Sequence, residues 1–134
     1  MTPVDAHERV DDLGVLYESH GPGIYALEVT VPTNVEAVQR RWLDAIGAPL
    51  PDEYAEQLAS CDTALYVGRS VDVYVRLMDH ARADIRRASF IRVFGMTDIH
   101  GVYPEDENTD VAERNRARSL SDADTVVWTD GELF

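Results

Sequence analysis

The chain has 134 residues, of which 45% are hydrophobic, so we expect one folded domain with a single core. Its single cysteine, Cys61, excludes an internal disulfide and a multi-cysteine zinc site. No apolar run approaches the roughly 20 residues of a membrane-spanning helix, and the acidic first twenty residues are unlike a signal peptide. We therefore expect a cytoplasmic protein with no membrane partner.

The first half of the chain is predicted to hold two strands separated by helices. Residues 1–21 form an N-terminal helix or arm, and the β-forming residues 24–31 form a strand that Pro32 ends. Thr33 or Asn34 can cap a helix over 35–46, because apolar residues recur there at helical spacing. A short helix over 52–60 follows, so residues 32–62 are predicted to form a helical insertion before the second strand at 63–68.

The second half continues the alternation of helices and strands. Ser70 is expected to cap a helix over 71–88, whose face with Arg76, His80 and Arg87 lies opposite the apolar stripe. The remaining elements are predicted as a strand at 89–95, an acidic loop at 104–110, a helix at about 110–120 and a strand at 125–129. Trp42 and Trp128 are expected in the core. This order predicts a small mixed α/β domain.

The charge is strongly acidic and unevenly distributed. The chain has 25 acidic and 12 basic residues, a net charge of -13, and all of its basic residues are arginines. Such a charge repels nucleic acid, but it also keeps a protein soluble in concentrated salt, and the absence of lysine favours salt adaptation. Residues 69–92 alone carry six arginines against three aspartates. This basic window is either the solvated face of a helix or a surface that faces phosphate.

Several residues that can carry chemistry occur in a distinctive order along the chain. Gly23–Ile24–Tyr25 opens the first strand and Tyr66–Val67–Gly68 closes the second. Arg76 and His80 follow one helical turn apart, and Glu113 opens the later helix. This ordered set resembles the GIY-YIG nuclease superfamily, with YVG in place of YIG, from Gly23 to the end of the chain apart from the insertion.

The resemblance implies a fold and an activity. The fold is a small three-stranded, mainly antiparallel sheet flanked by helices, which is of the α+β type. The activity is that of a metal-dependent endonuclease that hydrolyses phosphodiester bonds in nucleic acid, with DNA as the expected partner. Tyr25 and Tyr66 would line the active site, and Arg76 would contact the scissile phosphate. His80 matches a histidine common in the family, and Glu113 would bind a single Mg²⁺ or Mn²⁺ ion.

The chemistry of these side chains suits the implied roles. Arginine offers a planar fork to two phosphate oxygens, and a metal held by Glu113 would neutralise the charge that builds on the phosphate. A phenol with a pKa of about 10 is a weak base, so a tyrosine needs a nearby cation or acts as a proton relay. Arg69 stands where many family members carry a basic residue. With Arg86 and Arg87 it is a candidate for binding nucleic acid.

Two other functions stay open from the sequence. Family nucleases usually place an asparagine after the glutamate, whereas residues 122–128 contain none and Thr125 stands about where it is expected. That difference favours a module that binds nucleic acid or a partner protein without cutting. The net charge favours a third possibility, an acidic DNA mimic. Since the domain is small, a partner protein or a homodimer would supply the specificity of a nuclease.

Overall fold

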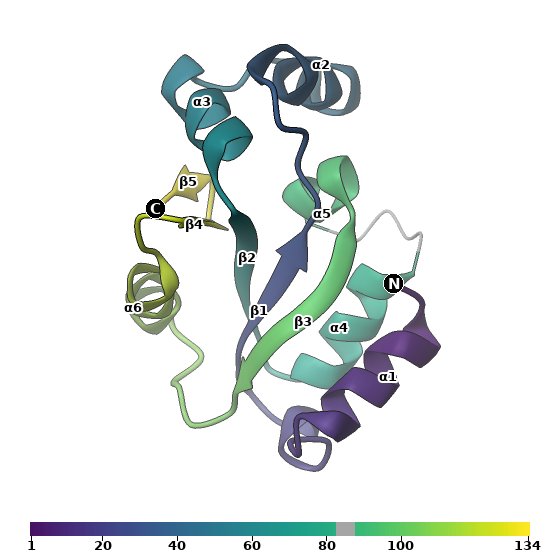
Figure 1. Cartoon of the computed structure of the whole chain (residues 1–134). Coiled ribbons are helices and arrows are strands. Elements are labelled where there is room, and N and C mark those ends of the chain that lie inside the picture. The colour runs from purple at the N-terminus through teal and green to yellow at the C-terminus, as the bar shows by residue number, and fades with distance from the viewer. Residues whose placement is uncertain (83–87) are drawn as a thin grey trace.

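A five-stranded mixed sheet with the strand order β3-β1-β2-β4-β5 forms the centre of the computed structural model, which describes residues 1–82 and 88–134 (Figure 1). The strands are β1 (Gly23–Val29), β2 (Thr63–Ser70), β3 (Met96–Tyr103), β4 (Thr125–Thr129) and β5 (Glu132–Leu133). β1 runs antiparallel to β2 and β3, whereas β4 is parallel to β2. The α+β class is confirmed, but the prediction of a three-stranded sheet is wrong, because β4 and β5 extend the antiparallel strands.

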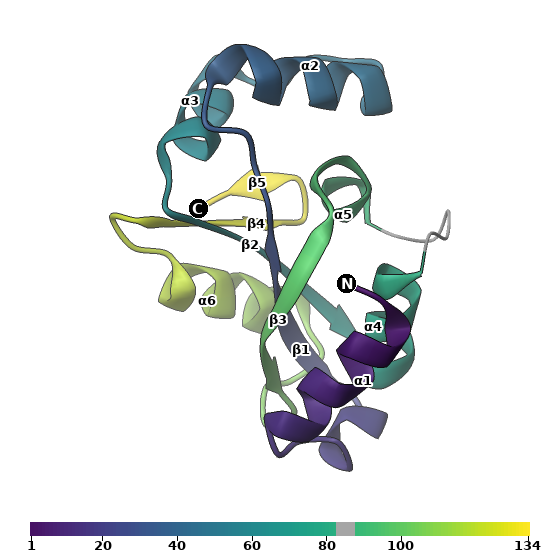
Figure 2. The same cartoon turned by 45° about the vertical axis from the view of Figure 1, so that its right-hand side comes forward.

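Helices cover both faces of this sheet. They are α1 (Pro3–Asp12), α2 (Val35–Ile46), α3 (Asp52–Ser60), α4 (Val73–Ala81), α5 (Ser89–Phe94) and α6 (Asp110–Leu120), with a short 3₁₀ turn at Glu18–His20. Figures 1 and 2 show α1 and α4 side by side on one face, α6 on the other, and α2 and α3 beyond one end of the sheet. None of the described helices has the length and apolar content needed to cross a lipid bilayer.

Local capping signals explain where several helices begin and end. The Asn34 side chain accepts a hydrogen bond from the backbone N–H of Ala37, and Gly47 ends α2 with a φ of 86°. Thr109 caps α6 in the same way as Asn34 caps α2. The cap of α4 is Asp72, whose side chain accepts from the N–H of Val75, and not Ser70 as predicted. The predicted ranges of α2, α3, α6 and β4 agree with the structure.

The segment predicted as the third strand is a helix. Residues 89–94 form α5, which Gly95 ends at a φ of 82°, and the strand follows at 96–103 as β3. A short apolar run does not distinguish a strand from a buried helix, and here Phe90, Ile91, Val93 and Phe94 are all buried. The helix predicted over 71–88 ends at Ala81. Arg86 and Arg87 lie outside the described residues.

The two faces of the sheet carry separate apolar clusters. The larger cluster packs Tyr25 and Leu27 against α4, α5 and α2, and it includes Trp42 and Trp128, as predicted. The smaller cluster lies under α6. Its buried members are Ile24, Ala26, Leu65, Val67, Ala117 and Val127.

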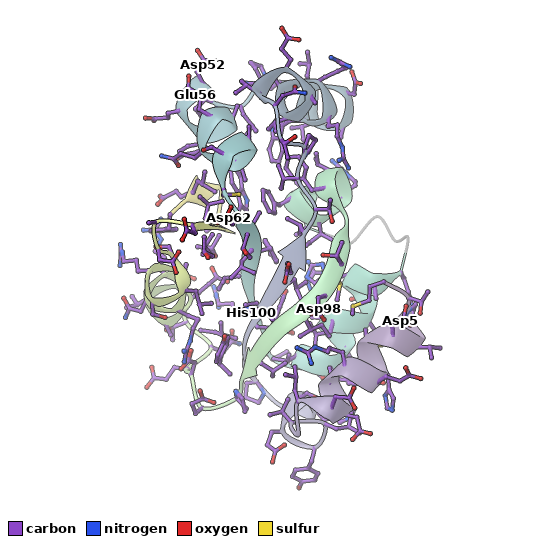
Figure 3. All side chains as sticks on the ribbon, viewed as in Figure 1. Asp5, Asp52, Glu56, Asp62, Asp98 and His100 are labelled. Atoms are coloured by element: carbon purple, nitrogen blue, oxygen red, sulfur yellow. The ribbon has the colours of Figure 1, made fainter. Side chains whose placement is uncertain are left out.

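The acidic side chains are spread over the surface. Figure 3 shows Asp52 and Glu56 on α3, Asp98 on β3 and Asp5 on α1. Some of these carboxylates have local partners, since Asp5 accepts from the N–H of Thr2 at the start of α1 and Asp98 lies 3.1 Å from Nε of Arg9. The negative charge is therefore distributed over several elements on this face.

Candidate active site

Tyr25 and Tyr66 lie on the same face of the two central strands. β1 and β2 are antiparallel, with Leu27 opposite Tyr66 and Gly68 opposite Tyr25. Side chains alternate between the faces of a sheet, so both tyrosines point toward the face that α4 covers. Their ring centroids are 6.3 Å apart. This register confirms the expectation that the two motif strands are antiparallel neighbours.

The glycine of the YVG motif makes room for the Tyr25 ring. A β-carbon built on Gly68 would lie 2.5 Å from the Tyr25 hydroxyl oxygen and 2.6 Å from its Cζ atom. Because both atoms belong to a ring that is buried in the core, they have little freedom to move away. Position 68 therefore has to be glycine for Tyr25 to lie across β2.

His80 contacts both tyrosines from α4. Its Nε2 lies 2.8 Å from the Tyr25 hydroxyl oxygen, and its ring centroid is 5.6 Å from that of each tyrosine. The prediction that His80 faces outward is wrong, since the residue is fully buried. His80 is three positions from the core residue Leu77, so it shares the face of α4 that packs on the sheet.

Arg76 lies one turn before His80 on α4 and reaches the same tyrosines. Its side chain is 29% exposed, and its Nη1 lies 4.0 Å from Oδ2 of Asp79. The charge of Arg76 and its hydrogen bond to the Tyr25 hydroxyl act to lower the pKa of that phenol. The guanidinium thus borders both the tyrosines and the solvent.

Burial controls the titration of the two tyrosines. Burial raises the pKa of Tyr25 well above its usual value, and the neighbouring Tyr66 adds to this rise. The pKa of Tyr66 is also raised, first by burial and then by the charge of Glu113, while Arg76 opposes both shifts. Both phenols therefore keep their protons at neutral pH.

Glu113 approaches the tyrosines from the opposite face of the sheet. It lies in the first turn of α6, and its side chain is 13% exposed. β4 ends at Thr129, just past the Tyr66–Trp128 pair, whereas β2 continues to Ser70. We call residues 68–70 the open edge of β2. The charge of Glu113 raises the pKa of both tyrosines, so its carboxylate lies within electrostatic reach of their hydroxyls past this edge.

Thr129, which the sequence did not indicate, connects Glu113 to the sheet. It is fully buried, and its hydroxyl donates to the carbonyl of Val67 at 2.9 Å. The Glu113 carboxylate is an alternative acceptor for the single proton of this hydroxyl. Thr125, the predicted stand-in for the family asparagine, pairs with Thr63 at the far end of β4, roughly 13 Å away by strand geometry. Thr129 is thus the residue of β4 that orients the glutamate.

The environment of Glu113 favours a bound cation. Burial raises the pKa of Glu113 above its usual value, and the charges of Asp130 and Asp110 add to this rise. The hydrogen bond with Thr129 and the charge of Arg69 oppose it. A partly buried carboxylate near two other negative charges is stabilised by a neighbouring positive charge. Glu113 is therefore suited to binding a divalent metal.

Arg69, a predicted nucleic-acid-binding residue, lies at the open edge of β2 against the start of α6. Its guanidinium forms an ion pair with Asp110, and its Nη1 donates to the Asn108 carbonyl at 3.4 Å. Its Nε lies 4.0 Å from Oε2 of Glu113.

The donor set fits one way of binding magnesium. Within residues 1–82 and 88–134, no three His, Cys, Asp or Glu side chains converge on a metal position. Mg²⁺, however, usually keeps several water ligands and binds one or two carboxylates together with the phosphate oxygens of a substrate. Glu113 is the carboxylate that would hold an ion in that mode.

Comparison of the chain with protein-family models, curated proteins and solved structures found no match. The functional interpretation of the site therefore depends on its own residues and geometry.

Proposed function

We propose that this domain is a metal-dependent endonuclease of the GIY-YIG type, which hydrolyses phosphodiester bonds in nucleic acid, with DNA as the substrate. One observation carries the proposal: side chains from β1, β2, α4 and α6 converge at the open edge of β2. They are Tyr25, Tyr66, Arg76, His80 and Glu113. Singly, each has an ordinary structural explanation, but together they combine a phosphate binder, proton carriers and a metal ligand.

Arg76 and Arg69 supply positive charge on either side of the open edge. A guanidinium can donate two parallel hydrogen bonds to phosphate oxygens, and this stabilises the charge that develops as the phosphorus is attacked. Arg76 borders the tyrosines, whereas Arg69 borders Glu113. We infer that Arg76 binds the scissile phosphate and that Arg69 contacts the neighbouring part of the strand.

Tyr25 and His80 are arranged to move a proton. In the tautomer with its proton on Nδ1, His80 accepts a hydrogen bond from the Tyr25 hydroxyl through Nε2. As water attacks the phosphorus, Tyr25 can take the proton of that water while it gives its own to His80. This relay needs no free phenolate, which agrees with the raised pKa of Tyr25. A Mg²⁺ or Mn²⁺ ion on Glu113 would neutralise the charge on the phosphate and the leaving oxygen.

A second candidate is a module of the same type that binds nucleic acid without cutting it. The resemblance implies an amide after the glutamate at about Thr125, whereas the β4 side chain that contacts Glu113 is the hydroxyl of Thr129. A threonine has one donor and holds it partly on the Val67 carbonyl. The carboxylate is therefore less firmly oriented than it would be by an amide.

The test is a cleavage assay in molar KCl, because the acidic chain is expected to be salt-adapted. Branched, single-stranded and duplex DNA, and RNA of the same sequence, are incubated with Mg²⁺, with Mn²⁺ or with EDTA. We expect strand cleavage that depends on metal and stops in EDTA. Binding without cleavage in either metal would support the second candidate, and the absence of both would refute the two proposals.

A further inference from the structure

A hollow of about 320 Å³ lies beside Tyr66, between helix α2 and the turn that joins β4 to β5. Its walls include the rings of Trp42, Tyr66, Phe90 and Trp128, and Asp130 and Ser89 contribute polar groups. We call it the aromatic pocket. Its volume is at the lower end of the range for small-molecule sites, so it suits one planar group of modest size.

The aromatic walls form a rigid surface. The rings of Phe90 and Trp128 are stacked with centroids 5.2 Å apart and planes at 6°, and the centroid of Trp42 lies 5.3 Å from that of Trp128. Tyr66 stacks on Phe90 at 6.5 Å. Trp42 and Trp128 are core residues with 7% and 8% of their surface exposed. The pocket is therefore formed by packed side chains that need little reordering to receive a flat ligand.

The pocket adjoins the candidate active site at Tyr66. The ring of Tyr66 lines the pocket, while Tyr66 also contacts His80 in the active site. Asp130 and Gly131 form the β4–β5 turn with φ values of 50° and 77°, the backbone of a tight two-residue hairpin. This turn holds Asp130 at the rim, and its charge is near enough to affect Glu113. Tyr66 and Asp130 are thus the residues through which the pocket adjoins the candidate active site.

A nucleobase matches both the walls and the rim. Every base has two flat faces that stack on aromatic side chains, and stacking of this kind is the usual way in which proteins hold unpaired bases. A carboxylate accepts hydrogen bonds from the amino groups of bases, as in the pairing of Asp or Glu with the N4 amino group of cytosine. A base within a duplex cannot enter a pocket, so the occupant has to be unpaired.

We propose that the aromatic pocket binds one unpaired base of the strand whose phosphate is held at Arg76, with Asp130 accepting from the amino group of that base. This inference rests on the proposed function and deepens it. It names the substrate as nucleic acid with an unpaired nucleotide beside the cleaved bond. Cytosine, adenine and guanine satisfy Asp130, whereas thymine lacks an amino group.

Both tryptophans of the chain line the pocket, so their fluorescence reports its occupancy. The wild-type protein is titrated in EDTA with three duplexes of one sequence. One carries a single unpaired cytosine, one an abasic residue at that position, and one is fully paired. We expect tryptophan quenching with the unpaired cytosine alone, and binding roughly 10-fold to 100-fold tighter than to the abasic duplex.

Two variants on α2 separate the pocket from the surrounding surface. Ile46→Phe adds volume inside the pocket, which Ile46 lines, and should remove the preference for the unpaired cytosine. Leu43→Phe makes the same kind of change at a position that is 48% exposed, and the preference should persist. If Ile46→Phe fails to fold, Asp130→Asn is the second test of the pocket. This variant should fold, because asparagine tolerates a positive φ. It should reduce the preference for unpaired cytosine over unpaired thymine.

The outcomes distinguish this inference from the proposed function. Equal binding of the cytosine and abasic duplexes without quenching would overturn the pocket, even if the protein cuts DNA in metal. Binding to none of the three duplexes would overturn it as well. Quenching that is selective for the unpaired base, together with no cleavage in Mg²⁺ or Mn²⁺, would support the pocket and refute the endonuclease.

Discussion

The two faces of the sheet contribute different chemistry and are packed to different degrees. The face under α1, α4 and α5 holds the larger apolar cluster, and it carries the tyrosines, His80 and Arg76. The face under α6 has six buried apolar residues, and it carries Glu113. Ala117 is the single buried residue of α6. The tyrosines and His80, the proposed proton carriers, are thus built into a dense core, whereas Glu113, the proposed metal ligand, lies on a lightly held helix.

The largest expected effect comes from removing the charged group of either face. Glu113→Gln keeps the size of the side chain but removes the charge, so metal-dependent cleavage should fall by at least about 1,000-fold. Arg76→Ala should lower the cleavage rate by about 100-fold to 1,000-fold through lost stabilisation of the transition state. Single-turnover rates measure both effects.

The dependence on metal concentration separates the two roles. Raising Mn²⁺ should restore part of the rate of Glu113→Gln, because a weakened metal site is refilled at higher concentration. It should leave Arg76→Ala unchanged. Cleavage by Glu113→Gln at the wild-type rate would show that Glu113 is not the metal ligand.

A smaller effect is expected from changing Thr129, which lies beside Glu113. Thr129→Val keeps the shape of the side chain but removes the hydroxyl, whose proton can go to the Glu113 carboxylate or to the Val67 carbonyl. Mutation of a residue that hydrogen-bonds to a metal ligand typically lowers metal affinity or activity by about 10-fold to 100-fold. More Mn²⁺ should therefore be needed for half-maximal cleavage. Thr125→Val is the matched control at the far end of β4, and it should behave like the wild type. A larger effect of Thr125→Val would restore the assignment made from the sequence.

The face of the sheet that carries the tyrosines is densely packed, so a larger side chain there should lower the stability of the fold. Gly68→Ala introduces a β-carbon 2.5 Å from the Tyr25 hydroxyl, so Tyr25 or the strand has to shift. We expect a loss of about 1–3 kcal/mol in the free energy of unfolding, measured by urea denaturation. Gly21→Ala is the control, because its β-carbon meets its nearest neighbour, the Glu18 carbonyl, at an ordinary 3.6 Å. Equal stability of the two variants would contradict the close approach at Gly68.

The smallest effect concerns salt and tests whether the α6 face is the weaker one. A net charge of -13 repels itself in dilute buffer, and concentrated KCl screens that repulsion. We expect the melting temperature to rise from dilute buffer to molar KCl. Amide hydrogen exchange in dilute buffer should show earlier loss of protection in α6 than in β1 and β2. Equal melting temperatures would argue against salt adaptation and favour an acidic DNA mimic.

Local signals in the sequence were sufficient to predict the elements whose ends are set by residues within or next to the element. Asn34 and Gly47 bound α2, and the GIY and YVG motifs indicated the two antiparallel strands that hold the tyrosines. Such signals act over a few neighbouring residues, through capping hydrogen bonds, backbone freedom and the period of apolar side chains. They failed for residues 89–95, because a short apolar run of this kind fits a buried strand as well as a buried helix.

Tertiary contacts alone decided how the site was completed. The hydroxyl of Thr129 bonds to the backbone of Val67 across 62 positions of the chain, and this contact depends on the parallel pairing of β2 with β4. His80 is buried because α4 turns that side toward the sheet, and the aromatic pocket arises where α2, α5 and β4 meet. The sequence by itself determined which side chains could carry chemistry. Which of them meet was decided by strand register and helix packing, since these place residues that are distant in the chain side by side.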